Sequence, residues 1–538
     1  MAENLSQIIH RITTAWRENK VVSVLFLDVE GAFPNAVPAK LIYNLKKRCI
    51  LTSIINFVKQ LLNNRKTRLK FDDYISETIT VTNGIGQGDP LSMILYIPYN
   101  SDLLEIPNNP QKKDGIGYVD DIALLAIAVN FTKTTKIIKD MMTRDKGSQE
   151  WSLTHNSRFE VIKSTISHFS RKTKQDPDSE NKCIPIMRPL LILGNQMVQE
   201  VNCYKYLGIQ IDSQLQWKEQ TQRALANATK WLLQFQRLSK PSTGVNTKLI
   251  RQLYLAVALP KITYGINVWY TLPTKPLGCT KKTGSVGALH NLQKTQRIAA
   301  LAITSTLRTT PTNFIDTHTG ILPIKLALLK ACHNTLIRLL TLPDHHALSQ
   351  IVRMARCSQL NKHLSPINQL IKQFNIGNNT IETIYPTAYL NRINTKYKMV
   401  IDSSRKESIK SKANDKANFK IYSDRSSQGN GIGSAAILYK KGKTGQLMLL
   451  KAYLGTAAEH NTYEAKILGT IIALLLIKNT PETIGKNVSL YTDNQSIIEA
   501  TSNPKSTSGQ YLIDTLRKLA NTVECNLYIQ WISSHSKV

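Results

Sequence analysis

Two apolar segments in the first half of the chain carry acids at one end. The segment VVSVLFL, residues 21–27, leads directly into Asp28. The segment IALLAIA, residues 122–128, directly follows the tandem acids Asp120 and Asp121. Apolar runs of this length predict buried strands, and a carboxylate beside such a strand is costly unless its charge is compensated. The pattern therefore predicts a sheet with acids at one edge, where they could bind metal ions.

Phosphoryl transfer to a nucleotide needs such an arrangement. Two Mg²⁺ ions about 4 Å apart are held by carboxylates on rigid elements that can lie far apart in the sequence. One acid at a strand end and an acid pair in a hairpin turn would supply these ligands. Taken alone, each acid has a structural alternative, because Asp often caps a turn.

A glycine-rich loop, NGIGQGDPLS at residues 83–92, lies between the two acidic segments. Its glycines would let the backbone approach a ligand closely, and Pro90 suits the first turn of a following helix. Such a loop alone could be an ordinary turn. Its position between the acidic segments favours a substrate contact.

The charge of the chain favours a polyanionic partner. The 538 residues include 69 Lys plus Arg against 37 Asp plus Glu, a net charge of +32. Nucleic acid is the first candidate, and a basic ribosomal-type or membrane-surface protein is the alternative. Hydrophobic residues make up 42% of the chain, which excludes a disordered protein.

The cysteines and the apolar stretches argue against a disulfide-rich, zinc-binding or membrane-spanning protein. The seven cysteines are scattered without a C-x-x-C pair, which argues against a zinc site or disulfide framework and fits a reducing compartment. The N-terminus shows no signal-peptide pattern. The longest apolar stretch, residues 467–477, is too short to span a bilayer, so we expect a buried helix and no membrane partner.

Patterning divides the chain into four segments. Short strand-like and helical runs alternate over residues 1–217, and amphipathic helical stretches dominate residues 218–400. Residues 401–417 are polar and Lys-rich and are interpreted as a linker. Residues 418–538 show a strand–strand–helix–strand pattern.

The last segment contains a second set of acids. Asp424 ends a predicted strand, Glu464 lies near the start of a long apolar helix and is expected to face the sheet, and Asp493 ends another strand. Three acids from separate elements suit a two-metal site for phosphodiester hydrolysis. The structural alternative is capping, for example of the helix that follows Asp493.

The motifs FLDVEGAF, GIGQGDPLS and YVDD, in this order, resemble the first three palm motifs of reverse transcriptases. Residues 151–170 and 204–218 resemble the fourth motif and the primer-gripping hairpin, and LYLAVALPKITYGINVW resembles the thumb of non-LTR retrotransposon enzymes of fungal type. This resemblance, over residues 20 to 325, implies an α+β polymerase palm with a helical thumb. It also implies that most of the fingers region is missing and that the chain is cut short at both ends.

The resemblance implies a role for each matching residue. Asp28 and Asp120 would hold two Mg²⁺ or Mn²⁺ ions, with Asp121 and the Val29 carbonyl in support. Phe33 would discriminate against a 2′-hydroxyl. Gln87 and Gly88 would contact the dNTP and the template, and Lys163 would place a charge near the pyrophosphate. For Lys163, a solvated helix charge is the alternative.

Residues 418–538 resemble ribonuclease H, an α/β domain with a mixed five-stranded sheet. Asp424, Glu464 and Asp493 match carboxylates that hold two metal ions, and His535 matches a mobile histidine that assists product release or is an ordinary loop residue. The fourth acid of the family would lie beyond Val538, and Arg425 replaces a usual glycine, so weak or absent hydrolysis is expected.

The resemblance implies an RNA-directed DNA polymerase with a linked ribonuclease H domain. Its partners would be an RNA template, a DNA primer, an RNA–DNA hybrid and dNTPs, and its location would be intracellular and nuclear. Two alternatives stay open: a catalytically decayed nucleic-acid-binding relic, and a basic scaffold without an active site.

Overall fold

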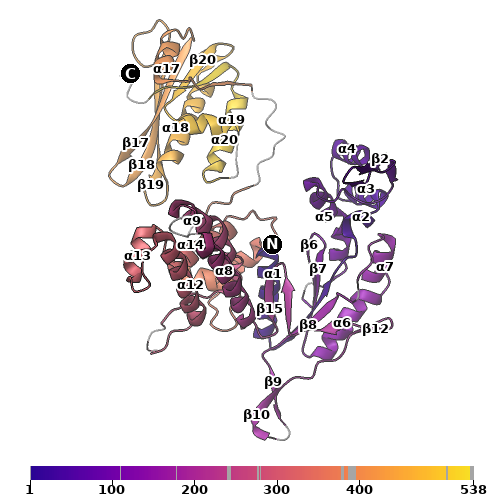
Figure 1. Ribbon diagram of the computed structural model, residues 1–538. Helices are drawn as coiled ribbons and strands as arrows, with labels where there is room; N and C mark the ends of the chain where they lie inside the picture. The colour runs from indigo at the N-terminus through magenta and orange to yellow at the C-terminus, as the bar shows by residue number, and fades with distance from the viewer. Residues whose placement is uncertain are drawn as a thin grey trace. The chain divides into compact units, whose positions relative to one another are not determined.

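The computed structural model describes residues 2–109, 111–160, 162–176, 179–238, 244–275, 278, 280–376, 381–385, 396–503 and 507–533. The chain forms two compact units (Figure 1). The first comprises Met1–Leu339 and Gln350–Asn379, and the second comprises Leu340–Ser349 and Thr380–Val538.

The first unit is built around a five-stranded sheet. Its strand order is β13 (Gln199–Glu200), β8 (Thr165–Phe169), β1 (Val21–Leu27), β7 (Asp121–Ala128) and β6 (Lys113–Tyr118). The central strand β1 runs antiparallel to both β7 and β8, and all its residues are buried. A strand buried on both faces has a continuous apolar sequence, which is why residues 21–27 read as a strand.

Helices pack against this sheet. Helices α1 (Ala2–Arg17) and α6 (Phe131–Thr143) both lie against β1, and Ile138, Met141 and Met142 of α6 share a core with Leu25 and Leu124. The other elements up to residue 212 are α2 (Ala32–Asn35), α3 (Pro38–Lys47), α4 (Thr52–Leu62), β2 (Arg65–Thr67), β3 (Lys70–Phe71), β4 (Tyr74–Ile75), β5 (Ile79–Val81), α5 (Pro90–Glu105), α7 (Ser148–Thr154), β9 (Thr173–Asp176), β10 (Ser179–Pro185), β11 (Ile192–Leu193), β12 (Gln196–Met197), β14 (Cys203–Tyr206) and β15 (Ile209–Asp212).

Helices dominate the chain after β15, in line with its amphipathic patterning. Leu232 and Phe235 of the first long helix pack with Tyr254 and Ile303 in one core. The helices are α8 (Lys218–Leu238), α9 (Thr247–Leu253), the π-helix η1 (Tyr254–Ala258), α10 (Leu259–Thr263), α11 (Ile266–Trp269), α12 (Val286–Thr304), α13 (Thr312–Thr319), α14 (Ile324–Leu340), α15 (Ser349–Cys357) and α16 (Pro366–Phe374). Within the described residues, no helix of the chain is both long and apolar enough to cross a membrane.

The second unit contains a mixed six-stranded sheet. Its strand order is β16 (Lys398–Val400), β21 (Asn526–Trp531), β20 (Asn487–Thr492), β17 (Phe419–Gln428), β18 (Gly431–Lys440) and β19 (Met448–Thr456). The pairs β17–β18 and β18–β19 are antiparallel, and the remaining pairs are parallel. The helices are α17 (Arg405–Ala413), α18 (Thr462–Lys478), η3 (Pro481–Thr483), α19 (Gln495–Ser502) and α20 (Gln510–Thr522), and α18 packs on β17 and β18.

The structure corrects two predictions for this unit. The sheet has six strands instead of five, because β16 pairs in parallel with β21. Residues 401–417 are not a linker: they contain α17, whose N-terminus is capped by the Ser404 side chain. Lys412 lies over the ring of Tyr422, with Nζ 5.0 Å from the ring centroid. Helix α17 packs through such polar and cation–π contacts, so the segment lacks the apolar periodicity that predicts a helix.

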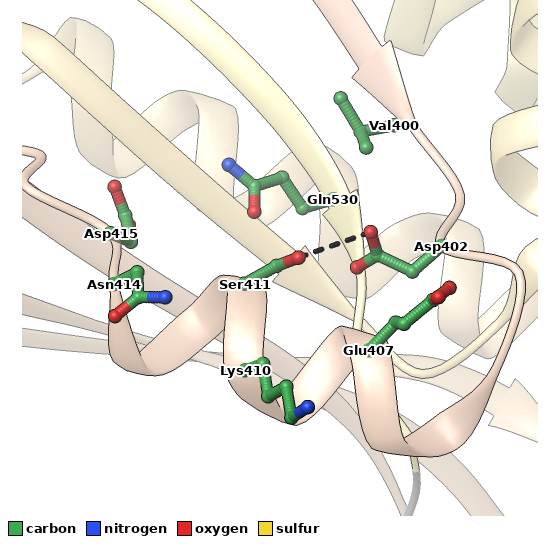
Figure 2. Close-up of a pocket in the computed structure, with 8 residues that line it drawn as sticks. All are labelled: Val400, Asp402, Glu407, Lys410, Ser411, Asn414, Asp415 and Gln530. Carbon is green, nitrogen blue, oxygen red and sulfur yellow. Dashed lines mark hydrogen bonds between the residues drawn. The ribbon is translucent and has the colours of Figure 1, made fainter.

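A polar pocket of about 540 Å³ lies between β16, α17 and β21 (Figure 2). The Ser411 hydroxyl donates to Asp402 across it. Its lining residues are Val400, Asp402, Glu407, Lys410, Ser411, Asn414, Asp415 and Gln530, and none of them was predicted as a site residue.

Candidate active site

The three acids of the first set lie at one edge of the first sheet. Strand β1 ends at Leu27, which pairs with Ile122, so this register carries Asp28 and Asp121 to the same edge on neighbouring strands. Strands β6 and β7 form a hairpin in which Tyr118 pairs with Asp121, which leaves Asp120 in the turn. The sheet thus brings together residues that are about ninety positions apart in the sequence.

Negative charge is concentrated at this edge. Burial and the neighbouring charges of Asp120 and Asp28 raise the pKa of Asp121 above its ordinary value. Tyr204 of β14 stacks on Phe26 at 4.0 Å between ring centroids, and burial with the charges of Asp121 and Asp28 raises its pKa to about 12. Three carboxylates gathered at one edge form a donor set suited to a hard divalent cation.

Lys163 supplies a positive charge beside Asp28. Its Nζ lies 3.7 Å from Oδ2 of Asp28 and 2.5 Å from Oε2 of Glu160. The Glu160 amide also donates to the Asp28 carbonyl at 3.0 Å. Glu160 was not predicted as a site residue, although its position three residues before Lys163 is a spacing that permits an ion pair.

The turn that carries Asp120 has an unusual backbone. Val119 adopts a φ of 58°, a left-handed conformation that is rare for a β-branched residue. The Asn100 side chain donates a hydrogen bond to the Val119 carbonyl and so helps to hold the turn. Strained residues of this kind persist where the surrounding structure fixes them, often at functional sites.

The glycine-rich loop packs against α2. The Gly84 amide donates to the Ala36 carbonyl at 2.7 Å, and the Ile85 amide donates to the Phe33 carbonyl at 2.8 Å. The Phe33 ring lies 5.3 Å from that of Tyr96, which is buried in α5. Burial raises the pKa of Tyr96, and the charge of Asp120 contributes. Tyr96 therefore connects Phe33 with the acidic edge.

Gln87 and Gly88 lie on the exposed part of the same loop. The next residue, Asp89, caps α5 by accepting a hydrogen bond from the Leu91 amide at 2.9 Å. The loop is thus fixed at both ends, by α2 and by the start of α5. Its exposed backbone between these points is free to contact a ligand.

Two alanine substitutions in this loop should differ in effect. Gly84 has a φ of 85°, and a Cβ there would lie 2.6 Å from the Pro34 carbonyl oxygen. Gly88 has a φ of 90°, but nothing lies within 4 Å of its Cβ position. We expect Gly88→Ala to lower the free energy of unfolding by about 1 kcal/mol, and Gly84→Ala by at least about twice as much. Thermal unfolding of the two variants checks this order, and equal losses would contradict it.

The raised pKa of Asp121 predicts a pH-dependent gain on substitution. Protons bind more tightly to this carboxyl in the folded chain, so its contribution to stability is present below the ordinary pKa of 3.8 and is lost as the pH rises through the raised value. Asp121→Asn should therefore raise the melting temperature at pH 7, and the gain should shrink as the pH falls towards 4. A gain that is independent of pH would contradict this account.

Two acids of the second set lie on neighbouring strands, but the prediction that Asp424 ends a strand is wrong, because β17 continues past it to Gln428. Tyr422 of β17 pairs in parallel with Tyr491 of β20, so Asp424 and Asp493 follow on neighbouring strands. Asp493 does not cap the next helix, because the Asn494 side chain does so. The Trp531 indole donates to the Asp493 carbonyl at 3.2 Å and holds this strand end in place.

Among the described residues, Glu464 does not form a metal-holding group with Asp424 and Asp493. Glu464 is the third residue of a capping box: Oε2 accepts from the Asn461 amide at 2.9 Å, while the Asn461 side chain accepts from the Glu464 amide. Lys466 takes the position beside Asp493, with Nζ at 2.8 and 2.7 Å from its two carboxylate oxygens. Glu464 is buried in α18, which packs on β17 and β18, and its expected place facing the sheet stays a prediction. The sequence N-T-Y-E already matches a capping box.

The two acidic sets differ in their fit to metal ions. Within the described residues, no three His, Cys, Asp or Glu side chains are grouped so that they could hold a metal ion. The donor chemistry of Asp28, Asp120 and Asp121 nevertheless suits divalent cations, because their charges repel one another. The second set does not fit, because Lys466 neutralises Asp493. His535 lies outside the described residues.

The sequence is similar to several proteins of mobile elements. It is 23% identical over 296 residues to the probable RNA-directed DNA polymerase from the Drosophila melanogaster X-element, covering 54% of this chain and 30% of that protein. It is 23% identical over 277 residues to the polymerase from the jockey element of the same organism, covering 50% and 28%. It is 22% identical over 270 residues to a Pol polyprotein from the R2 element of Popillia japonica, covering 49% and 43%. No protein family model matches.

Solved structures offer only partial likenesses. The N-terminal RNase H domain of a Mycobacterium tuberculosis protein matches 21% of this chain and 86% of that chain, with 20% identity and a TM-score of 0.19. A foamy viral protease–reverse transcriptase in complex with RNA/DNA hybrid matches 96% of this chain and 65% of that chain, with 10% identity and a TM-score of 0.23. TM-scores this low establish neither fold nor function.

The relatives named above define a class, the RNA-directed DNA polymerases of mobile elements. This chain is homologous to those of non-LTR retrotransposons, as the resemblance of its ordered motifs implied. It spans less than half of the length of the X-element, jockey and Popillia R2 proteins.

Proposed function

We propose that the first unit is an RNA-directed DNA polymerase that extends a DNA primer with dNTPs on an RNA template. The observation that carries this proposal is the gathering of Asp28, Asp120 and Asp121 at one sheet edge, where burial and the charges of Asp120 and Asp28 raise the pKa of Asp121. Its sheet would be the palm, and the helices after β15 would be the thumb.

Each residue at this edge has a proposed part. Asp28, Asp120 and Asp121, with the Val29 carbonyl, would hold Mg²⁺ or Mn²⁺ ions, which would stabilise the charge that develops during phosphoryl transfer. Lys163 would add positive charge near the leaving pyrophosphate from its position beside Asp28. These assignments require the dNTP to enter between Lys163 and the turn at Asp120.

A second group of residues would select and position the nucleotide. The Phe33 ring, held by its contact with Tyr96, would occupy the space that a 2′-hydroxyl needs. Gln87 and Gly88 would contact the dNTP and the template from the exposed loop. The net charge of +32 favours binding of the nucleic-acid backbone.

The second unit would be a ribonuclease H-like domain that binds RNA–DNA hybrids, and the protein would act in the nucleus. A second candidate function, a nucleic-acid-binding relic without catalysis, is favoured by one observation. In the second unit, the ammonium of Lys466 donates to both carboxylate oxygens of Asp493, one of the acids expected to hold metal ions. Loss of hybrid cleavage in the second unit would not argue against polymerase activity in the first, because the two acidic sets lie in different units.

Primer extension on a poly(rA)–oligo(dT) template with Mg²⁺ or Mn²⁺ tests the polymerase proposal. We expect dTTP-dependent extension on the RNA template. Absence of extension, together with retained hybrid binding in the same samples, would contradict the polymerase and support the relic.

A further inference from the structure

We infer that the Lys466 ammonium replaces a divalent cation at Asp493, so that the second unit binds an RNA–DNA hybrid without metal-dependent cleavage. The choice of an RNA–DNA hybrid as the ligand rests on the proposed function, whereas the replacement of the cation is inferred from the contacts of Lys466 alone. The inference deepens the proposal, because it makes this unit a binding module for the polymerase and not a second nuclease.

The geometry of the pair supports this inference. Lys466 Nζ donates to both carboxylate oxygens of Asp493, at 2.8 and 2.7 Å. A metal ion bound by Asp493 would use the same two oxygens. The side chains are 20% and 21% exposed, so water screens the pair only in part.

The helix holds Lys466 in this position. Its neighbours in α18, Ala465 and Ile467, are completely buried, so the backbone of this turn cannot shift without disturbing the core. The Ala465 carbonyl also accepts a hydrogen bond from the Ser434 hydroxyl of β18, which ties the turn to the sheet. Asp493 is held from the other side by Trp531. The backbone that carries Lys466 is therefore held beside Asp493.

The surrounding charges do not offset Lys466. Glu464, two residues earlier, directs its carboxylate to the Asn461 amide and is 3.4 Å from Nδ1 of His460. Asp424 is exposed, and one of its oxygens accepts from the Arg425 amide at 2.7 Å. A divalent cation at Asp493 would thus meet the ammonium of Lys466, and no metal-holding group of three such side chains occurs among the described residues. Two positive charges so close repel one another strongly.

Mn²⁺ binding to the full-length chain tests the inference. Asp28→Asn and Asp120→Asn are introduced first, so that the first acidic set no longer contributes. In this background we expect no Mn²⁺ binding that depends on Asp493, as followed by the electron paramagnetic resonance of free Mn²⁺. Adding Lys466→Glu, which supplies a carboxylate at the same position, should create a site with at least about tenfold tighter binding, and Asp493→Asn should abolish it. The control is Lys451→Glu, the same charge change at an exposed position of β19.

Thermal unfolding provides a second readout that does not need metal-dependent activity. Lys466→Met leaves Asp493 without its partner and should lower the melting temperature in EDTA, and Mn²⁺ should restore it in part. Mn²⁺ binding at Asp493 with equal affinity in the presence and absence of Lys466 would overturn the inference. Primer extension and hybrid binding are measured on the chain with Lys466→Glu as its only change. If neither this chain nor the unmodified chain extends a primer or binds the hybrid, the proposed function is wrong. The Mn²⁺ measurement would still decide whether Lys466 replaces the cation.

Discussion

Asp28→Asn is expected to lower the rate of primer extension by roughly 10³-fold, equivalent to about 4 kcal/mol of lost transition-state stabilisation. The amide keeps the size of the side chain but removes the negative charge at the end of β1. It also weakens the contact with Lys163, which lies 3.7 Å from Oδ2. Fold and hybrid binding should change little, because Asp28 lies beyond the buried part of the strand. Single-turnover extension compared with thermal unfolding separates the two effects.

The control for this substitution is Asp145→Asn, at an exposed position outside the candidate site. It makes the same chemical change and should leave extension within a factor of about two, as surface substitutions usually do. A similar loss in both variants would mean that net charge, rather than the position of Asp28, determines activity.

Phe26→Ala should destabilise the first unit by about 3–5 kcal/mol. Phe26 is 1% exposed in the central strand, and its ring stacks on Tyr204 at 4.0 Å and lies 5.4 Å from Tyr206. Truncation would leave a cavity two residues before Asp28, so extension should fall together with the melting temperature. Calorimetry of the full chain should show the loss in the transition of the first unit.

Two further substitutions serve as controls for Phe26→Ala. Phe26→Leu should cost less than Phe26→Ala, because it retains most of the buried volume. Phe57→Ala removes an equal ring from α4, where the side chain is 56% exposed, and should have little effect on stability. If Phe26→Ala lowered the stability as little as Phe57→Ala does, the described packing around Phe26 would be wrong.

The first acidic set could be predicted from sequence because its elements are simple. A continuous apolar strand ending in Asp28 and a hairpin turn carrying Asp120 leave little freedom for the acids once the strands pair. The contribution of Glu160 was missed because it depends on a backbone contact with Asp28 between segments far apart in the sequence. Periodicity cannot reveal such a contact.

The second set shows where sequence patterns fail. Helix α18 is apolar around most of its circumference, so its sequence does not indicate which side faces the sheet. The position of Glu464 near the helix start led to its selection as a site residue, whereas in the structure Lys466 contacts Asp493. Helix α17 was mistaken for a linker for a related reason, since its contacts are polar and leave no apolar stripe.

The central claim is that the edge holding Asp28, Asp120 and Asp121 carries out nucleotidyl transfer. Its most direct test is incorporation of a single dNTP by the full chain and by Asp120→Asn, at saturating RNA–DNA template–primer, with binding measured in the same samples. The account predicts Mg²⁺- or Mn²⁺-dependent incorporation that falls by roughly 10³-fold in the variant while binding is retained. Equal incorporation by both proteins, or incorporation by neither despite binding, would contradict it.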